Sequence, residues 1–418
     1  MKRWLSGFGI FFLLMGNLLA EENQNPIDLA YKTRLVGEGH SGRGDSVFAR
    51  GLPLTSFGRD RARLEGEARG KAGPLSLLLT ETVSDQEGAK PSSRSLINEA
   101  YADFGGGGFH GTVGRKVLSG DVGYGFRSID VIQREARLQV LPPALEGVNH
   151  ISVARFTASR AWTMILANPG EGRRGDPKDD GSLAVRYYQR AGGTDVHGVA
   201  RFSDRFRLET GAAASVVPHE SLELHGSFLY QRRGERLAPL AEPASPSQLL
   251  SSDSALENKS ITSVRKALAG FTWTHESGGS LLGEAWWDRS APSAADWQRL
   301  AAQARQRNAL AALPGVPATA VAGALAASTR MFQQPSLARR AALARIAWSD
   351  PQGGRWSTAL DLLRSLDDGG YSATASVGWE ADKLRLDVGV RRFGGKPDSA
   401  YRLLPERGVA FIGASLAF

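Results

Sequence analysis

Every odd position of the stretch RDRARLEGEARGK, which spans residues 59–71, holds a charged residue, and apart from Asp60 the even positions are uncharged. Side chains recur on one face of a helix every three or four residues, but on one face of a strand every two. Two glycines inside the stretch disfavour a helix further. The pattern therefore predicts a long strand with one ionised face and one face of small apolar side chains. A soluble sandwich would normally bury larger side chains, such as Val, Ile or Phe, on the apolar face.

The same alternation recurs along the chain in segments of about ten residues that end at turn residues. Examples are DLAYKTRLV at 28–36, LAVRYYQR at 183–190 and KLRLDVGVR at 383–391. Every second connection is short, whereas most others are long, notably those near 39–58, 118–149, 233–260 and 289–337. Outer-membrane barrels have this organisation, with polar side chains toward the lumen, apolar ones toward lipid, and short periplasmic turns. The sequence predicts an all-β transmembrane antiparallel barrel of about 18 strands, with about 16 as the alternative.

The N-terminus has the organisation of a secretory signal peptide. Lys2 and Arg3 precede an apolar run that ends at Ala20, and acidic residues follow. We predict cleavage after Ala20, which assigns residues 1–20 to the signal peptide and 21–418 to the barrel. An uncleaved membrane anchor is the alternative. The sequence has no cysteine, which suits export to an oxidising compartment.

No later segment offers the roughly 20 uninterrupted apolar residues of a spanning helix. The strongest rival, residues 309–328, is interrupted by Pro314 and Pro317. The mature chain is therefore either a soluble periplasmic protein or a closed barrel, because only closure satisfies the backbone groups of strands in lipid. The loop at 289–337 is rich in good helix formers, so we expect a partly helical extracellular loop. The sequence leaves open whether this loop enters the lumen or covers it from outside.

The final strand, GVAFIGASLAF, ends on Phe418 and resembles the last strand of bacterial outer-membrane proteins. The resemblance implies assembly in a Gram-negative outer membrane, with Phe418 as a signal for the barrel-assembly machinery. A second segment, GRKVLSGDVGYGFRSIDVIQRE at 114–135, resembles strand-to-loop segments of large porin-type barrels, including those of the alginate-export type. The sequence has Ser119 where a Trp is common in that group. A plain glycine-rich outer loop is the alternative interpretation.

Charged residues on the polar parity are the candidate pore lining. They are Arg61, Arg63, Arg69, Arg155, Arg186, Arg190, Arg201, Arg207, Arg385, Arg391, Glu65 and Glu67. A low-dielectric wall focuses their field into the pore, and rings of arginine favour anions. Alternatively, the charges pair across strands and neutralise one another. The formal net charge of the full chain is +8.

Other functional classes find little support in the sequence. The glycines at 105–108 are not followed by a helix, so they do not form a phosphate-binding loop. The histidines have no close partner at metal-ligand spacing, and we expect no metal or other cofactor. His225 and Ser227 offer a nominal base and nucleophile as neighbours on one strand face, and we expect no enzyme activity. The signal peptide and the lack of an aromatic–basic module argue against nucleic-acid binding.

The sequence thus predicts an outer-membrane, porin-like channel through which small anionic solutes diffuse passively. Its expected partners are outer-membrane lipid and lipopolysaccharide, the barrel-assembly machinery and those solutes. Two alternatives remain at this point: an export conduit for an anionic polysaccharide, and a surface-binding or adhesion barrel with a closed lumen.

Overall fold

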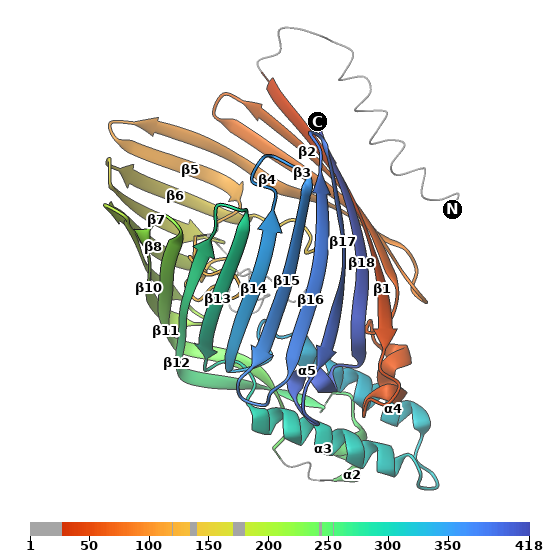
Figure 1. Cartoon of the computed structure of the whole chain (residues 1–418). Helices are drawn as coiled ribbons and strands as arrows, with labels where there is room; N and C mark the ends of the chain where they lie inside the picture. The colour runs from red at the N-terminus through yellow and green to blue at the C-terminus, as the bar shows by residue number, and fades with distance from the viewer. Residues whose placement is uncertain (1–26, 119, 134–139, 170–179, 242–244, 254) are drawn as a thin grey trace.

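A computed structural model of the chain describes residues 27–118, 120–133, 140–169, 180–241, 245–253 and 255–418 (Figure 1). The predicted signal peptide at residues 1–20 lies outside this range. Within the described part of the chain, no helix combines the length and the apolar character needed to cross a membrane.

The structure is one closed sheet of 18 antiparallel strands in which each strand pairs with its sequence neighbour. The first and last strands complete the ring, since Lys32 pairs with Ala417 and Gly39 with Ala410. The predicted fold class, including the favoured strand number, is confirmed. The strands are β1 (Ile27–Gly42), β2 (Arg61–Ala72), β3 (Leu75–Gln86), β4 (Ser92–Gly106), β5 (Phe109–Lys116), β6 (Val148–Phe156), β7 (Arg160–Ala167), β8 (Ser182–Ala191), β9 (Thr194–Ser203), β10 (Arg207–His219), β11 (Leu222–Pro239), β12 (Leu256–Thr274), β13 (Gly279–Asp288), β14 (Arg340–Ser349), β15 (Trp356–Ser365), β16 (Tyr371–Glu380), β17 (Leu384–Gly394) and β18 (Glu406–Ala417).

Alternation in sequence becomes alternation between the two faces of the wall. Leu35 is 50% exposed on the outer face, whereas its neighbour Val36 is 2% exposed on the inner face. On β17 the outward residues Val388 and Val390 flank the inward Gly389. An outer surface of exposed apolar side chains is what a barrel in lipid requires. This is why the small apolar residues of β2 form a poor soluble core: they line the outside of the barrel.

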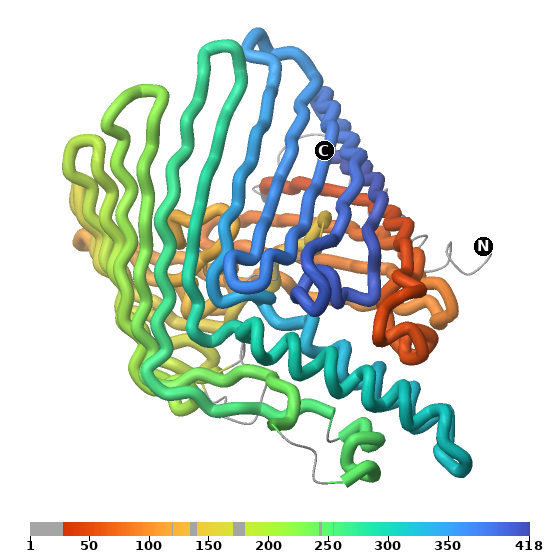
Figure 2. Tube along the Cα trace, turned by 60° about the horizontal axis from the view of Figure 1, so that its bottom comes forward, coloured from red at the N-terminus to blue at the C-terminus, as the bar shows by residue number. Residues whose placement is uncertain are grey.

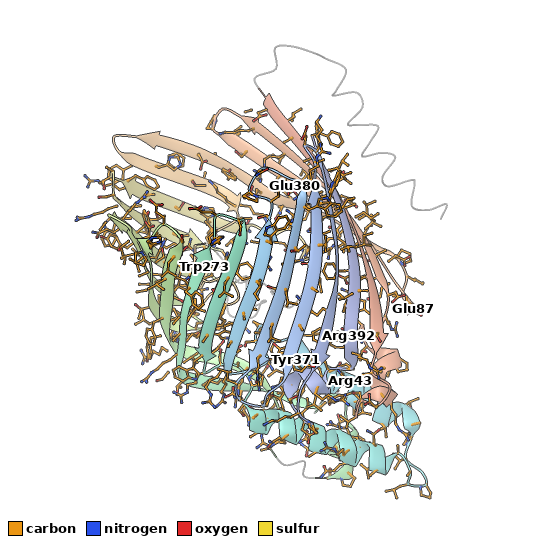
Figure 3. All side chains as sticks on the ribbon, viewed as in Figure 1. Arg43, Glu87, Trp273, Tyr371, Glu380 and Arg392 are labelled. Atoms are coloured by element: carbon orange, nitrogen blue, oxygen red, sulfur yellow. The ribbon has the colours of Figure 1, made fainter. Side chains whose placement is uncertain are left out.

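The two ends of the barrel differ as predicted. Short turns, the start of β1 and the end of β18 share one end, where the Phe418 N–H donates to the Tyr31 carbonyl at 2.8 Å. Long connections gather at the other end, which we call the extracellular end (Figure 1). Aromatic side chains lie outward near both ends of the strands; Trp273 and Tyr371 are examples at opposite ends (Figure 3). Such rings are typical of membrane interfaces.

A helical cap covers part of the extracellular end. It comprises α3 (Ala294–Leu310) and α4 (Ala318–Ser328), together with η3 (Thr329–Gln333), η1 (Ala49–Leu54), α2 (Pro246–Leu250) and α5 (Ala400–Leu403). A capping box between Ser293 and Asp296 begins α3. Figure 2 shows α3 and α4 lying across the end of the barrel, so most of the predicted helical loop lies outside the lumen.

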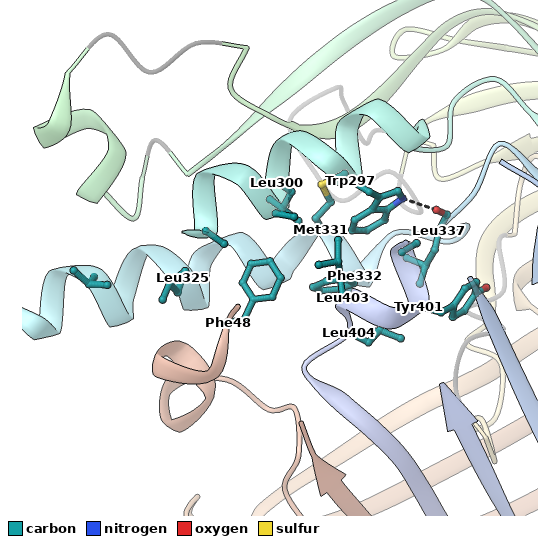
Figure 4. Packing of buried hydrophobic residues seen from close by; sticks show 14 residues of the cluster. Phe48, Trp297, Leu300, Leu325, Met331, Phe332, Leu337, Tyr401, Leu403 and Leu404 are labelled. Atoms are coloured by element: carbon teal, nitrogen blue, oxygen red, sulfur yellow. Dashed lines mark hydrogen bonds between the residues drawn. The ribbon is translucent and has the colours of Figure 1, made fainter. Parts of the chain in front are cut away.

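The cap has its own apolar core, shown in Figure 4. The Trp297 indole is buried, stacks on Phe332 and donates to the Leu337 carbonyl at 2.7 Å. Burial lowers the pKa of Arg307 to about 10, and this guanidinium donates to the Leu249 carbonyl at 2.8 Å. Segments from four different connections therefore form one packed unit.

One predicted loop is shorter than expected. The connection near 233–260 contains extensions of β11 and β12, which pair as far as Pro239 and Leu256. These extensions carry charged and polar residues on both faces, so they lack the alternation that identifies a membrane-spanning strand. Only residues 240–255 connect the two strands, and they include α2.

Candidate channel and its constriction

The connection between β5 and β6, residues 117–147, folds into the barrel. We call it the inner loop; residue 119 and residues 134–139 lie outside the described part. Its described residues form hydrogen bonds with side chains of β1, β2, β4, β11 and β13. A loop fixed to so many strands is held across the lumen. This segment, and not the helical loop at 289–337, is therefore the main element that narrows the barrel.

A buried carboxylate on β13 holds the start of the inner loop. The Glu284 side chain accepts the N–H groups of Tyr124 at 2.6 Å and Gly125 at 2.7 Å. Its Oε1 also lies 3.0 Å from His225 Nε2 on β11. A Cβ added to Gly125 would lie 2.7 Å from Leu343 Cδ2, so the backbone of the loop runs close to the wall here. Backbone donors that converge on an ionised carboxylate form strong hydrogen bonds.

A buried amide on β4 holds the end of the inner loop. The Asn98 Nδ2 donates to the Leu145 carbonyl at 2.8 Å, and the Asn98 Oδ1 accepts the Gly147 N–H at 2.9 Å. The pairing of β3 with β4 is irregular next to Asn98. This irregularity turns the amide toward the loop.

Apolar contacts hold the middle of the loop. Ile129, Val131 and Ile132 are buried against inward side chains that include Ile165 on β7 and Leu229 on β11. Apolar residues on the inner face are unusual for a wide pore, whose interior is polar. The middle of the inner loop therefore occupies the part of the lumen next to β6–β11.

Two acidic side chains stabilise the fold of the inner loop itself. Asp121 accepts the N–H groups of Val122 and Ile129, each at 2.7 Å. Asp130 accepts the Gly120 N–H at 3.0 Å and lies 3.4 Å from the Arg127 guanidinium. Burial raises the pKa of both carboxyls, and for Asp121 the nearby Asp130 contributes further.

A cavity of about 790 Å³ lies between the inner loop and the wall formed by β13–β18. Its wall carries charged and hydroxyl side chains: Arg345, Asp361, Ser372, Thr374, Asp387 and Arg391. Its mouth is apolar, because Phe332, Leu337, Tyr401 and Leu404 of the cap line it on the extracellular side.

Two arginines on the β13–β18 wall of the cavity, Arg345 and Arg391, have different hydrogen-bond partners. Arg345 NH1 lies 2.8 and 2.9 Å from the two oxygens of Asp361, so a carboxylate neutralises it locally. Arg345 also lies over the Tyr124 ring, with its guanidinium carbon 5.3 Å from the ring centre. Arg391 Nε donates to the Thr374 hydroxyl at 2.8 Å. Asp361 also interacts electrostatically with Arg391, so the two arginines share this carboxylate.

Most of the predicted lumen residues lie on the inner face of the wall. They are Arg61, Arg63, Glu65, Glu67, Arg69, Arg186, Arg190, Arg201, Arg385 and Arg391. Of these, only Arg391 lines the cavity. Arg63 donates instead to the Leu141 carbonyl of the inner loop at 2.5 Å. A role in selectivity remains a prediction for this set.

Two of the predicted lumen residues lie elsewhere. Arg155 shares the parity of Ile151 and Val153, which are exposed on the outer face, so its prediction as a lumen residue is wrong. Arg207 begins β10 with a left-handed backbone (φ 61°), and its exposed side chain reaches Asp204 at 3.5 Å outside the lumen. A one-residue change of parity moves a side chain to the opposite face.

Ion pairing accounts for many of the remaining charges. Arg201 is buried between Glu209 at 2.5 Å and Asp180 at 3.3 Å. Arg385 pairs with Glu380 at 3.2 Å and with Asp387 at 3.0 Å. The alternative of cross-strand neutralisation therefore applies to the Arg201–Glu209 and Arg385–Glu380 pairs.

The residues considered for catalysis have structural partners. Ser227 accepts a hydrogen bond from Ser128 of the inner loop at 2.7 Å, and His225 bonds with Glu284. Within the described ranges, no three His, Cys, Asp or Glu residues gather to hold a metal ion. The roles of Asn98 and Tyr124 were not predictable, because they depend on contacts between distant segments.

Comparisons with known proteins agree with this geometry. No family model matches the sequence, and no curated protein does. Among solved structures, OprD from Pseudomonas aeruginosa matches with a TM-score of 0.55 at 6% identity, over 96% of this chain and 95% of that one. A BenF-like porin from Pseudomonas fluorescens matches at 0.55 and 8% identity (94% and 98% covered). OccAB1 from Acinetobacter baumannii matches at 0.54 and 10% identity (94% and 96% covered).

The fold is that of an outer-membrane porin. The predicted porin-type barrel is confirmed, and the predicted outer-membrane localisation agrees with both the fold and the apolar outer wall. The narrower resemblance to alginate-export barrels is not supported by these comparisons, since the matched structures are OprD-like, BenF-like and Occ porins.

Proposed function

We propose that the chain is a porin-like channel through which small anionic solutes diffuse across the outer membrane. The observation that carries the proposal is the cavity of about 790 Å³ between the inner loop and the β13–β18 wall, with Arg391 on that wall. A loop that crosses the lumen leaves room for a small solute and disfavours the passage of a bulky polymer. Guanidinium groups in a narrow, low-dielectric passage attract anions and bind carboxylates or phosphates in a planar fork.

The cavity combines two kinds of surface that act in sequence. Phe332 and Tyr401 at the mouth offer apolar contact, and the Arg345–Asp361 pair and Arg391 follow deeper in the passage. Because Asp361 offsets the charge of Arg345, we expect weak to moderate anion preference instead of strict exclusion of cations. Small organic anions with an apolar part fit this order of contacts.

Reversal potentials across a planar bilayer with a salt gradient test the proposal. Arg391→Gln should lower the permeability ratio of anions to cations, because it removes one of the positive charges that line the cavity. Arg155→Gln is the matched control, since it removes the same charge from the outer face. Equal selectivity of the wild type and Arg391→Gln would contradict the proposed role of this arginine.

A further inference from the structure

A second concavity lies on the outside of the barrel near the extracellular ends of β9–β12. It has a volume of about 450 Å³, and it is lined by Phe202, Arg207, Arg232, Arg233 and Thr262. Phe202 is 53% exposed and shares the outward parity of Val196, so the pocket opens on the outer face and not into the lumen. These strands stand at the left of Figure 1. The pocket does not share a lining residue with the channel cavity.

Local irregularities of the backbone bring the three arginines together. Arg207 has a left-handed backbone directly after the β9–β10 turn, which costs energy for a residue with a side chain. The pairing of β11 with β12 passes from Gln231–Val264 to Arg233–Thr262 without a paired residue between them. Ser263, at this interruption, also has a positive φ of 54°. Both irregularities lie at the rim of the pocket.

The charge of the pocket is not balanced by the described residues. Arg207 has one partner, Asp204 at 3.5 Å, and Asp204 is itself highly exposed. The side chains of Arg232 and Arg233 have no hydrogen bond or ion pair with any residue that the structure describes. Neighbouring arginines do: Arg205 lies 2.7 Å from Glu235. Like charges at close range repel, so an anion bound among the three guanidinium groups would stabilise this arrangement.

The surroundings indicate which anion fits. The wall toward the membrane centre carries exposed apolar side chains, including Leu208 and Phe228. A ligand here would therefore place an anionic group among the arginines and apolar chains against the wall below. The geometry points to a binding site for a phosphate group of a phosphorylated glycolipid in the outer leaflet. Phe202 contacts the start of the acyl region, and the arginines hold the phosphate.

Retention of bisphosphorylated lipid A by the purified full-length protein, measured by native mass spectrometry, tests this site. The variant Arg232→Gln/Arg233→Gln should bind this lipid about tenfold more weakly or worse, because two charge-assisted contacts are lost. The matched control is Arg155→Gln/Arg160→Gln, which removes two outward charges at the opposite end of the wall and should bind like the wild type. Enzymatically dephosphorylated lipid should bind the wild type as weakly as the double variant binds the bisphosphorylated form.

Three results would overturn the proposal. They are unchanged lipid binding by Arg232→Gln/Arg233→Gln, an equal loss in the control, and equal binding of the dephosphorylated lipid. If millimolar inorganic phosphate binds the wild type and displaces the lipid completely, the site takes free phosphate and the lipid assignment is wrong. Channel conductance should be the same in the double variant and the wild type, so a failure here is distinct from a failure of the proposed channel.

Discussion

The carboxylate of Glu284 is the contact on which the position of the inner loop depends most. It accepts two backbone N–H groups, from Tyr124 and Gly125, and it is fully buried beside His225. Each hydrogen bond to a charged acceptor contributes about 1.5–3 kcal/mol. Glu284→Gln keeps one acceptor oxygen. Its amide NH₂ group, which is a donor, replaces the second oxygen that accepts a backbone N–H hydrogen bond. We therefore expect the anchored state of the loop to lose about 3–6 kcal/mol relative to detached states.

A loss at the lower end of this range raises the detached population by roughly 100-fold. Hydrogen exchange followed by mass spectrometry should show lower protection of residues 120–130 in Glu284→Gln, and single-channel records should show greater current noise in the open state. Glu223→Gln is the control, because it also neutralises a carboxylate near His225. Glu223 lies on β11, is half-exposed, and is 4.0 Å from His225. Unchanged protection in Glu284→Gln, or equal changes in both variants, would refute the assignment of Glu284 as the anchor.

Three further outcomes follow from the same contacts. Gly123→Ala should disturb the fold of the inner loop and change the channel conductance, because its Cβ would lie 1.9 Å from the Phe126 carbonyl oxygen. Gly120→Ala is the control: its Cβ would meet only the end of an arginine side chain at 3.5 Å, so its conductance should equal that of the wild type. Trp297→Ala should destabilise the cap by about 3–5 kcal/mol, detected as faster proteolysis of α3 and α4, with exposed Gln298→Ala as the control. The pKa of Asp121 is raised, so the folded loop favours the protonated carboxyl. The stability that this carboxyl contributes is fully present below its ordinary pKa of 3.8 and is lost as the pH rises through the raised pKa. Hydrogen-exchange protection near residue 121 should therefore fall over this pH interval in the wild type, and fall less in Asp121→Asn.

The barrel itself could be predicted from the sequence because its cause is local. Each membrane-spanning strand must alternate between lipid and lumen, and each short turn must carry turn residues, so the pattern of β17 or of the Gly105–Gly108 turn is readable without any distant contact. The helix at 294–310 was predictable for a similar reason, since helix-forming residues fill that segment. These elements follow from composition and period alone.

The constriction could not be predicted, because its cause is not local. Glu284 lies 160 residues from Tyr124, and no pattern in either segment indicates that they meet. The error at Arg155 has a different origin: Ile151 and Val153 fix the parity of β6, and that signal was present in the sequence. Arg207 was misplaced because a left-handed residue after a turn interrupts the parity of its strand.

Single-channel recording of the unmodified protein in a planar bilayer with a potassium chloride gradient tests the central claim most directly. The structure predicts discrete conductance steps from a narrowed pore, with a reversal potential on the anion side. A membrane that stays silent after verified insertion would contradict the open cavity as a channel. Conductance steps with a preference for cations would contradict the role assigned to Arg345 and Arg391.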